Sequence, residues 1–193
     1  FRDGGDGLAQ FRAPMGVAVD AAGRVYVADT WNDRIRVIEP DGSVRTLAGG
    51  DGPGFRNGRG GSARFDTPTA LALDGHGRLW VADTGNRALR RVDPDGVVDA
   101  WRPSPWADAD DDPTIAAPLS LAVTHDGHLY LAELSPGRVL QLSPDGRVRV
   151  VAGEEGARWF ARPSALWLDD DGSLLVADAA GHRLHRLAPR TGD

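Results

Sequence analysis

Short apolar segments recur in pairs along this chain. The first pair covers about 15–20 and 24–29, and both members are nearly free of charged residues apart from their ends. Such runs are typical of strands in a sheet that is covered on both faces. A short turn ending in Gly joins the two segments in every pair, which is a hairpin signal because Gly accepts the positive φ of a tight turn. Equivalent pairs follow at 68–74 with 78–83, 118–124 with 128–133, and 163–169 with 173–178.

Two further strands are predicted after each pair. The segment 33–39 alternates Ile35 and Val37 with Arg34 and Arg36, and it ends at a Pro-Asp-Gly turn that returns at 94–96 and 144–146. A fourth strand is expected at 43–48, with counterparts at 97–101 and 147–152. No apolar stripe of period 3.6 extends over ten residues, so the pattern indicates an all-β chain.

The repeat decides the predicted architecture. The prolines that open the four pairs lie 54, 50 and 45 residues apart, close to the 40–50 of propeller repeats. We therefore expect one β-propeller domain, 1–193, of four blades with four antiparallel strands each. The blades cover about 11–49, 65–101, 115–153 and 160–193, and the last one lacks its outer strand.

One motif in the repeat resembles a known family. Ala28 to Ile35 reads Ala-Asp-Thr-Trp-Asn-Asp-Arg-Ile, and Ala82 to Asn86 reads Ala-Asp-Thr-Gly-Asn. These segments resemble the signature of NHL repeats. The resemblance implies a β-propeller, usually six-bladed, that binds proteins, RNA or small ligands on one face. It extends more distantly to propeller lyases and to hydrolases of the gluconolactonase kind.

The first and last segments of the sequence indicate how many blades to expect. Segment 1–11 aligns with the inter-blade segment 55–65, and the last blade stops after its third strand near Leu187. We expect a piece of a longer, six-bladed propeller in preference to a four-bladed object with an incomplete blade. Either arrangement leaves an open edge strand that is able to pair with another chain.

Composition restricts the partners. The net charge is −6, and basic residues are interleaved with acidic ones, so nucleic acid is an unlikely partner. Cysteine is absent, which removes disulfides and thiolate metal sites. No apolar run reaches the roughly 18 residues of a membrane span. The compartment is not readable from the sequence.

An acid and an arginine recur in every repeat. We expect each acid to end the second strand, to cap the following turn and to pair with the arginine near the start of the third strand. Recurrence in all four blades favours a structural role over a catalytic one. The predicted pairs are Asp29 with Arg34, Asp83 with Arg87, Glu133 with Arg138, and Asp178 with Arg183.

Aromatic and basic residues in loops are the candidate binding residues, because Trp and Arg dominate recognition surfaces. They are Trp31, Trp101, Arg102, Trp106, Arg158 and Trp159. The loop 100–115 also carries aspartates at 108, 110, 111 and 112. It lacks the central Gly and closing Glu of a calcium loop, so we favour a solvated acidic loop over a calcium site.

The remaining chemistry is sparse. The five histidines lie mostly in turns without metal-type spacing and are expected at the surface, and no nucleophile elbow is present. We therefore expect no catalytic residues, metal or cofactor. The favoured function is a non-catalytic scaffold that binds a protein, a peptide or a small polar ligand on a propeller face through its inter-blade loops. The alternatives are a metal-dependent hydrolase of the gluconolactonase type and an extracellular sensor domain of a larger receptor.

Overall fold

The computed structural model describes residues 1–5, 7–101, 115–153 and 160–188. The chain divides into two compact units, Phe1–Trp101 and Arg102–Asp193. The described residues form strands and two short 3-10 helices, η1 (Thr30–Asn32) and η2 (Gly60–Ser62), which confirms the all-β prediction. None of these helices is long and apolar enough to cross a membrane.

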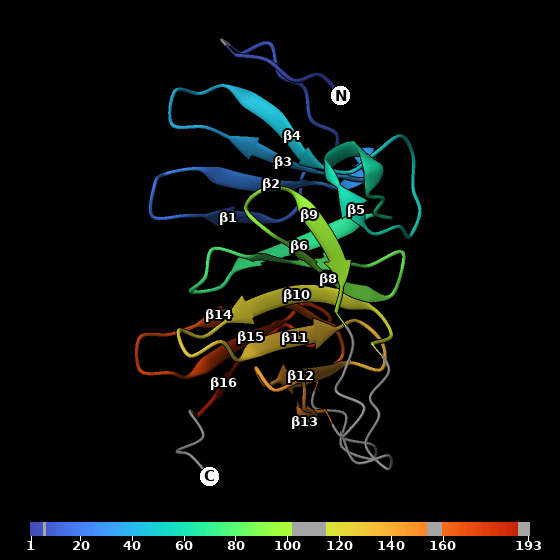
Figure 1. Ribbon diagram of the computed structural model, residues 1–193. Coiled ribbons are helices and arrows are strands. Elements are labelled where there is room, and N and C mark those ends of the chain that lie inside the picture. Colours follow the sequence, from blue (N-terminus) through green and yellow to red (C-terminus); the bar gives the residue numbers. More distant parts are fainter. Residues whose placement is uncertain (6, 102–114, 154–159, 189–193) are drawn as a thin grey trace. The chain divides into compact units, whose positions relative to one another are not determined.

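The first blade of unit 1 is a four-stranded antiparallel sheet in which strands adjacent in sequence pair with each other (Figure 1). Its inner strand begins at Val17, later than the predicted 15–20, although the Met15 N–H still donates to the Ala28 carbonyl of the second strand at 3.2 Å. The strands are β1 (Val17–Val19), β2 (Val25–Asp29), β3 (Arg34–Ile38) and β4 (Val44–Ala48).

The second blade of unit 1 repeats this meander and adds a two-residue strand, β5 (Gly58–Arg59), at its outer edge against β9. A register shift follows the opening proline, between Pro68 and Ala70. The same shift occurs at the opening proline of both blades of unit 2. The main strands are β6 (Pro68–Leu73), β7 (Leu79–Asp83), β8 (Ala88–Val92) and β9 (Val97–Ala100).

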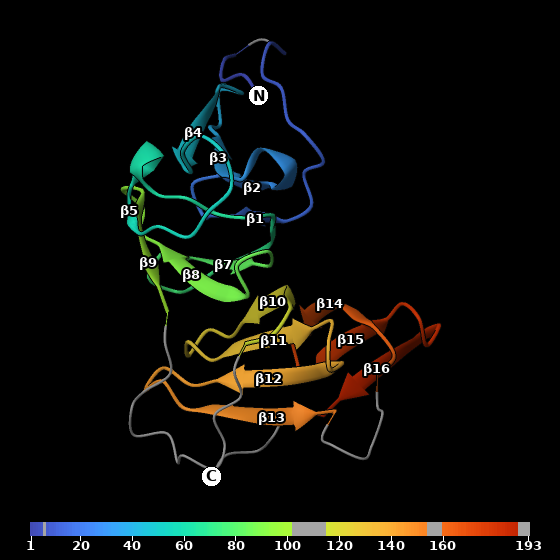
Figure 2. The ribbon, with the colours of Figure 1, turned by 90° about the vertical axis from the view of Figure 1, so that its right-hand side faces the viewer.

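Unit 2 contains one complete and one three-stranded blade. The complete sheet is β10 (Pro118–Val123), β11 (Leu129–Glu133), β12 (Arg138–Leu142) and β13 (Val148–Ala152). The other is β14 (Pro163–Leu168), β15 (Leu174–Asp178) and β16 (Arg183–Leu187). Within the described residues, β16 is therefore an outer strand with one neighbour, as the sequence predicts (Figure 2).

Each unit buries a core between its two sheets. In unit 1, Ile35 and Val37 of β3 and Val81 of β7 are fully buried in one cluster. In unit 2, Val139 and Val176 are the fully buried counterparts in a second cluster. The two sheets of unit 1 approach each other closely near their inner strands, where a Cβ on Gly16 would lie 2.8 Å from the Cα of Ala70. These blade-to-blade cores explain the apolar second strands, whereas Val17 and Val19 of the first strand β1 are about 60% exposed.

The first hairpin of each blade in unit 1 is fixed by an aspartate. Asp74 Oδ1 accepts hydrogen bonds from the N–H groups of His76 and Arg78, and Oδ2 accepts from the Arg78 side chain and Trp80 Nε1. Asp20 makes the equivalent contacts in the first blade, with Tyr26 in place of Trp80. The predicted Gly that closes each turn has a positive φ, as at Gly23 and Gly77.

Candidate functional site: the turns between the second and third strands, and an inter-blade pocket

The acid at the end of the second strand ties each blade to the segment that enters it. In all four blades its carboxylate accepts a hydrogen bond from the backbone N–H of the residue 17 positions earlier. The distances lie between 2.6 and 2.9 Å, and the four acids are at most 3% exposed. The donors are Arg12 for Asp29, Asp66 for Asp83, Ala116 for Glu133, and Ala161 for Asp178. Each acid thus anchors the backbone of the segment that enters its blade.

The predicted arginine partners are wrong in unit 1. Asp29 pairs with Arg36, two residues beyond Arg34, at 2.9 Å, and both side chains are fully buried. Arg34 points instead to the Gly49 carbonyl and the Asp51 carboxylate, at 2.8 and 2.9 Å. Arg34 stands where the strand begins, beside the outgoing loop. Arg36 lies one cross-strand pair further along on the same face and so reaches Asp29 diagonally.

The second blade repeats the correction. Asp83 pairs with Arg90 at 2.9 Å, again with both side chains fully buried. Arg87 cannot take this place because it adopts a left-handed φ of 51° in the turn, outside β8. Asn86 caps the turn by donating to the Asp83 carboxylate at 2.8 Å.

The two buried arginines also hold the incoming segments. The Arg90 guanidinium donates to the carbonyls of Arg64 and Arg56 and to Asn57 Oδ1, and it lies 4.5 and 5.2 Å from the ring centres of Phe55 and Phe65. Arg36 makes the matching contacts to segment 1–11. Its partners there are the carbonyls of Gln10 and Arg2, the carboxylate of Asp3, and the rings of Phe1 and Phe11. The arginine therefore joins ion pairing, backbone recognition and cation–π contact in one buried group.

In unit 2 the acids at the end of the second strand have different partners. Arg138 pairs with Glu133 as predicted, because the longer Glu side chain reaches the arginine that opens β12. The Asp178 carboxylate accepts N–H bonds from Ala161, Arg162 and Gly181, and the described residues show no ion pair from it to Arg183. The predicted Asp178–Arg183 pair is therefore wrong, because backbone donors occupy the carboxylate.

His185 occupies the place of the buried arginines in the last blade and is half-buried, although a surface position was predicted. Its ring meets Phe160 edge to face at 5.1 Å, and its Nε2 has no hydrogen-bond partner among the described residues. A cavity of about 480 Å³ adjoins it. The described lining residues are Pro136, Phe160, Ala161, Asp178, Gly181, Arg183 and His185.

The pKa values of two of these acids shift in opposite directions. Desolvation raises the pKa of Asp83, and hydrogen bonds from the Asp66 N–H, Asn86 and Arg90 offset that effect only in part. Burial also acts to raise the pKa of Asp178, but the N–H groups of Ala161, Arg162 and Gly181 outweigh it and hold the pKa below its usual value. In both acids the carboxylate oxygens accept hydrogen bonds from neighbouring donors.

Trp31 lies on the surface at the turn that follows β2. Its side chain is 60% exposed, yet its backbone is fixed, since its N–H donates to the Arg12 carbonyl at 3.1 Å. The Arg12 guanidinium covers the indole at 5.5 Å from the ring centre. The preceding residue, Thr30, is buried and donates its hydroxyl to the Pro68 carbonyl of the next blade at 2.8 Å. The turn thus presents an exposed aromatic on a rigid base.

The other candidate binding residues are not brought to Trp31 by the described structure. Trp101 is half-buried and donates its N–H to the Leu89 carbonyl, in line with the β8–β9 ladder. The remaining candidates and the aspartate-rich loop lie outside the described residues. They are Arg102, Trp106, Arg158, Trp159 and the aspartates 108, 110, 111 and 112.

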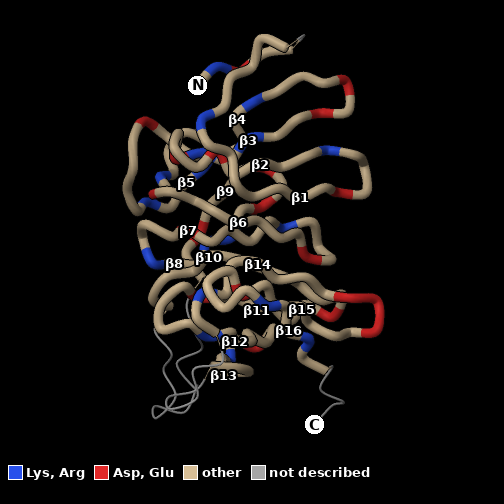
Figure 3. The backbone as a smooth tube through the Cα atoms, turned by 180° about the vertical axis from the view of Figure 1, so that it is seen from behind, with Lys and Arg blue, Asp and Glu red and all other residues tan. Residues whose placement is uncertain are grey.

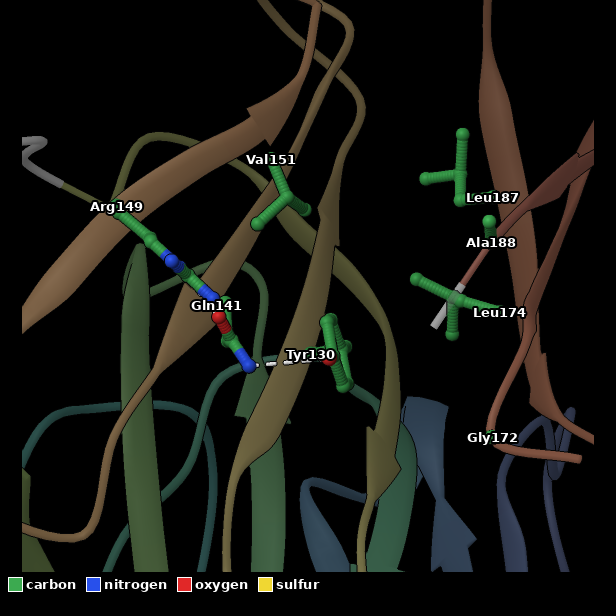
Figure 4. Close-up of a pocket in the computed structure, with 8 residues that line it drawn as sticks. All are labelled: Tyr130, Gln141, Arg149, Val151, Gly172, Leu174, Leu187 and Ala188. Carbon is green, nitrogen blue, oxygen red and sulfur yellow. Dashed lines mark hydrogen bonds between the residues drawn. The ribbon is translucent and has the colours of Figure 1, made fainter. Parts of the chain in front are cut away.

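A pocket lies between the two sheets of unit 2 (Figure 4). Its volume is about 40 Å³, and it has a polar wall and an apolar wall. On the polar wall Gln141 donates to the Tyr130 hydroxyl at 3.0 Å and accepts from Arg149. The apolar side includes Leu174 and Leu187. The remaining lining residues are Val151, Gly172 and Ala188.

Sequence reasoning missed Arg36, Arg90 and the pocket. A signal for the arginines was present, since both stand seven residues after the acid and both follow a segment that begins and ends with Phe. Within the part of the chain that the structure covers, no three His, Asp or Glu side chains group in a way that would hold a metal ion.

The chain is similar to known propeller proteins. The NHL repeat model matches residues 11–38. Mouse NHL repeat-containing protein 3 is 33% identical over 192 residues, which cover 93% of this chain and 51% of the relative. Virginiamycin B lyase of Nocardia farcinica is 29% identical over 177 residues, covering 91% of this chain and 52% of the lyase.

A solved structure agrees at the level of the fold. Virginiamycin B lyase from Staphylococcus aureus superposes with a TM-score of 0.68 at 17% identity, over 95% of this chain and 55% of that one. The chain therefore spans about half the length of each of these proteins. The matching repeat, the similar relatives and the four repeated sheets together show that the chain belongs to the NHL-repeat β-propeller family.

Proposed function

We propose that this chain is a non-catalytic binding scaffold that recognises a protein or peptide at the turns between its second and third strands. At the coarse level, membership of the NHL-repeat family supports a protein-interaction scaffold. The finer assignment, to the surface around Trp31, is our own.

The exposure of Trp31 on an immobilised turn supports the proposal most directly. A large aromatic side chain that is rigid before binding loses little conformational entropy on binding. Trp31 meets this condition because the turn is held by Asp29, Thr30 and the Arg12 carbonyl. Arg12 adds a cation beside the ring, and Trp and Arg are both enriched among the residues that dominate binding energy.

Peptide selection tests this function. A displayed library of random peptides would be selected against the immobilised 193-residue chain and then measured against the Trp31→Ala variant. We expect enriched peptides to bind the variant at least about 10-fold more weakly, as for a binding hot spot. Trp167→Ala is the matched control, since Trp167 is similarly exposed, at 68%, on β14. Enriched peptides that bind Trp31→Ala as well as the native chain, or an absence of enriched peptides, would contradict the proposal.

The second candidate is an enzyme built on the same propeller. The similarity to the Nocardia lyase, over 91% of this chain, favours it. The metal-dependent hydrolase of the gluconolactonase type is one form of this candidate. Measuring the melting temperature with added metal ions distinguishes a metal-dependent enzyme from the scaffold.

A further inference from the structure

The outer edge of the second blade of unit 1 is covered by the chain itself. The short strand β5 pairs with β9, and the Gly60 N–H then donates to the Gly96 carbonyl at 2.9 Å. Figure 2 shows β5 beside β9. We call residues 57–60 the strap. It occupies backbone groups of β9 that an edge strand would otherwise offer to another chain.

The first blade has the same arrangement with one difference in chemistry. Gly4 aligns with Gly58, and it exchanges two backbone hydrogen bonds of 2.9 Å with Val44 of β4. The two glycines have φ values of 150° and 148°, which residues with a side chain rarely adopt. The backbone therefore requires Gly at this position in both blades. The residue before it is Asp3 in the first blade and Asn57 in the second.

Asp3 uses both of its carboxylate oxygens. Oδ1 accepts from the Arg36 guanidinium at 2.6 Å and from the Thr46 hydroxyl at 3.1 Å, and Oδ2 accepts from the Thr46 N–H at 3.1 Å. Asn57 has its Oδ1 in the matching role, 2.9 Å from the Arg90 guanidinium. The other terminal atom of Asn57 is an amide nitrogen, which donates hydrogen bonds and does not accept them.

The residue of β9 that corresponds to Thr46 is Ala100. Thr46 pairs with the buried arginine of the first blade, and Ala100 pairs with Arg90. Trp101 donates its N–H to β8, so the N–H of the preceding Ala100 points away from β8, toward the edge that the strap covers. The side chain at position 57 therefore meets two donors, a guanidinium and a backbone N–H. A carboxylate suits this place better than a carboxamide.

The dipeptide Asn57–Gly58 is also chemically reactive. Asn57 is exposed, so water reaches its side chain, and Gly58 has no side chain to hinder its backbone nitrogen. The hydrogen bond from Arg90 to Oδ1 polarises the carboxamide. It also stabilises the oxyanion that forms when a nucleophile attacks Cγ.

We propose that Asn57 is a site of spontaneous deamidation, and that the resulting aspartate is held by Arg90 as Asp3 is held by Arg36. The Gly58 nitrogen attacks Asn57 Cγ and loses its proton, the bond from Cγ to the side-chain nitrogen breaks, and ammonia leaves a cyclic succinimide. Water then adds at Cγ and breaks its bond to the Gly58 nitrogen. This step restores the backbone and leaves a carboxylate at position 57.

The reaction requires the strap to separate briefly from β9. Gly58 lies two residues before Gly60, whose N–H donates to β9, so the Gly58 N–H points to β9 as well. A two-residue strand has few hydrogen bonds to break, which favours local opening. After reclosure the new carboxylate accepts from Arg90 and from the Ala100 N–H, and it fastens the strap. This inference does not depend on the function proposed for the Trp31 surface.

Peptide mapping by mass spectrometry tests the reaction. The native 193-residue chain is incubated in mildly alkaline buffer, and electron-transfer fragmentation separates aspartate from isoaspartate, the product of water adding at the backbone carbonyl instead. We expect aspartate to accumulate at position 57. The other two asparagines serve as internal controls and should persist, because larger residues follow them: Asn32 precedes Asp33, and Asn86 precedes Arg87.

Two variants with the same change of charge test the role of the product. Asn57→Asp should raise the urea midpoint of unfolding by about 0.5 M, as expected for a hydrogen bond to a charged group. Asn86→Asp should lower the midpoint by about 0.5 M or more. The reason is that Asn86 Nδ2 donates to the Asp83 carboxylate and the Gly54 carbonyl, and a carboxylate would meet two acceptors there.

Three results would overturn the proposal. One is the persistence of asparagine at position 57 after prolonged incubation. Another is isoaspartate as the main product, because it lengthens the backbone before Gly58 and moves β5 out of register with β9. The third is a midpoint for Asn57→Asp at or below that of the native chain, which would show that the position does not favour a carboxylate.

Discussion

At the scale of single residues, the acid-to-arginine pair is the most tightly constrained feature of unit 1. The sequence predicted the acid correctly because its place at the end of a strand is a local property. It did not predict the partner, because Arg34 and Arg36 alternate with apolar residues on one strand and so face the same side. Contacts with segment 1–11, distant in sequence, decide between them.

Arg90→Met is expected to destabilise the chain strongly. The change leaves Asp83 buried without its cation and frees the carbonyls of Arg64 and Arg56. Breaking a buried pair in this way costs about 3–5 kcal/mol of unfolding free energy. Urea unfolding followed by circular dichroism measures it.

Arg91→Met is the matched control, one residue along and partly exposed. Its pair with Asp99 spans 3.9 Å, so a loss of no more than about 1 kcal/mol is expected. Equal destabilisation by the two variants would show that the buried pair has no special role.

At the scale of elements, the first hairpin of each blade illustrates how far a sequence specifies local structure. The Asp-to-Gly turns predicted the β1–β2 and β6–β7 hairpins because all their contacts lie within six residues. The pocket beside β16 could not be predicted this way. It lies between β12 and β13 of one sheet and β15 and β16 of the next. The packing of two sheets against each other is not encoded in a local sequence pattern.

The β6–β7 hairpin should respond to acid. Burial alone would raise the pKa of Asp74, but hydrogen bonds from the N–H groups of Arg78 and His76 and from the Arg78 and Trp80 side chains hold the pKa below its usual value. A lowered folded-state pKa means that the unfolded chain takes up the proton first. The stabilisation is therefore complete above pH 4 or so and is lost as the pH falls through the folded-state pKa.

Asp74→Asn should remove this dependence. We expect a loss of about 1–2 kcal/mol at pH 7 and a smaller further loss between about pH 5 and pH 2 than in the native chain. Unfolding midpoints in urea across this range measure both. Asp170→Asn, in the exposed acidic β14–β15 turn visible in Figure 3, serves as the control. An unchanged acid profile in Asp74→Asn would rule out this role for Asp74.

At the scale of the whole molecule, the repeat predicted the propeller blades and their strand order. It succeeded because the same turn and strand signals return four times, so that an error in one copy is corrected by the others. Function did not follow in the same way, since each blade differs most in the segments that lie outside the repeat.

Metal ions distinguish the scaffold from the metal-dependent enzyme. A metal at 100 times its dissociation constant adds about 2.7 kcal/mol to stability, which corresponds to roughly 5–10 °C in melting temperature for a chain of this size. We expect calcium, zinc and manganese to shift the melting temperature of chelator-treated protein by less than about 1 °C. A saturable rise with any of them would favour the enzyme.

The constant spacing of 17 residues between each terminal acid and its backbone donor has a practical meaning. The hydrogen bond fixes the number of residues between the start of a blade and its acid, and it does not restrict the length of the chain before that start. The hydrogen bond sets no limit on the length of the chain before residues 116 and 161, whereas the segment before residue 66 is itself held by Arg90. An engineer who wished to graft new recognition sequences onto this scaffold would insert them before residues 116 and 161.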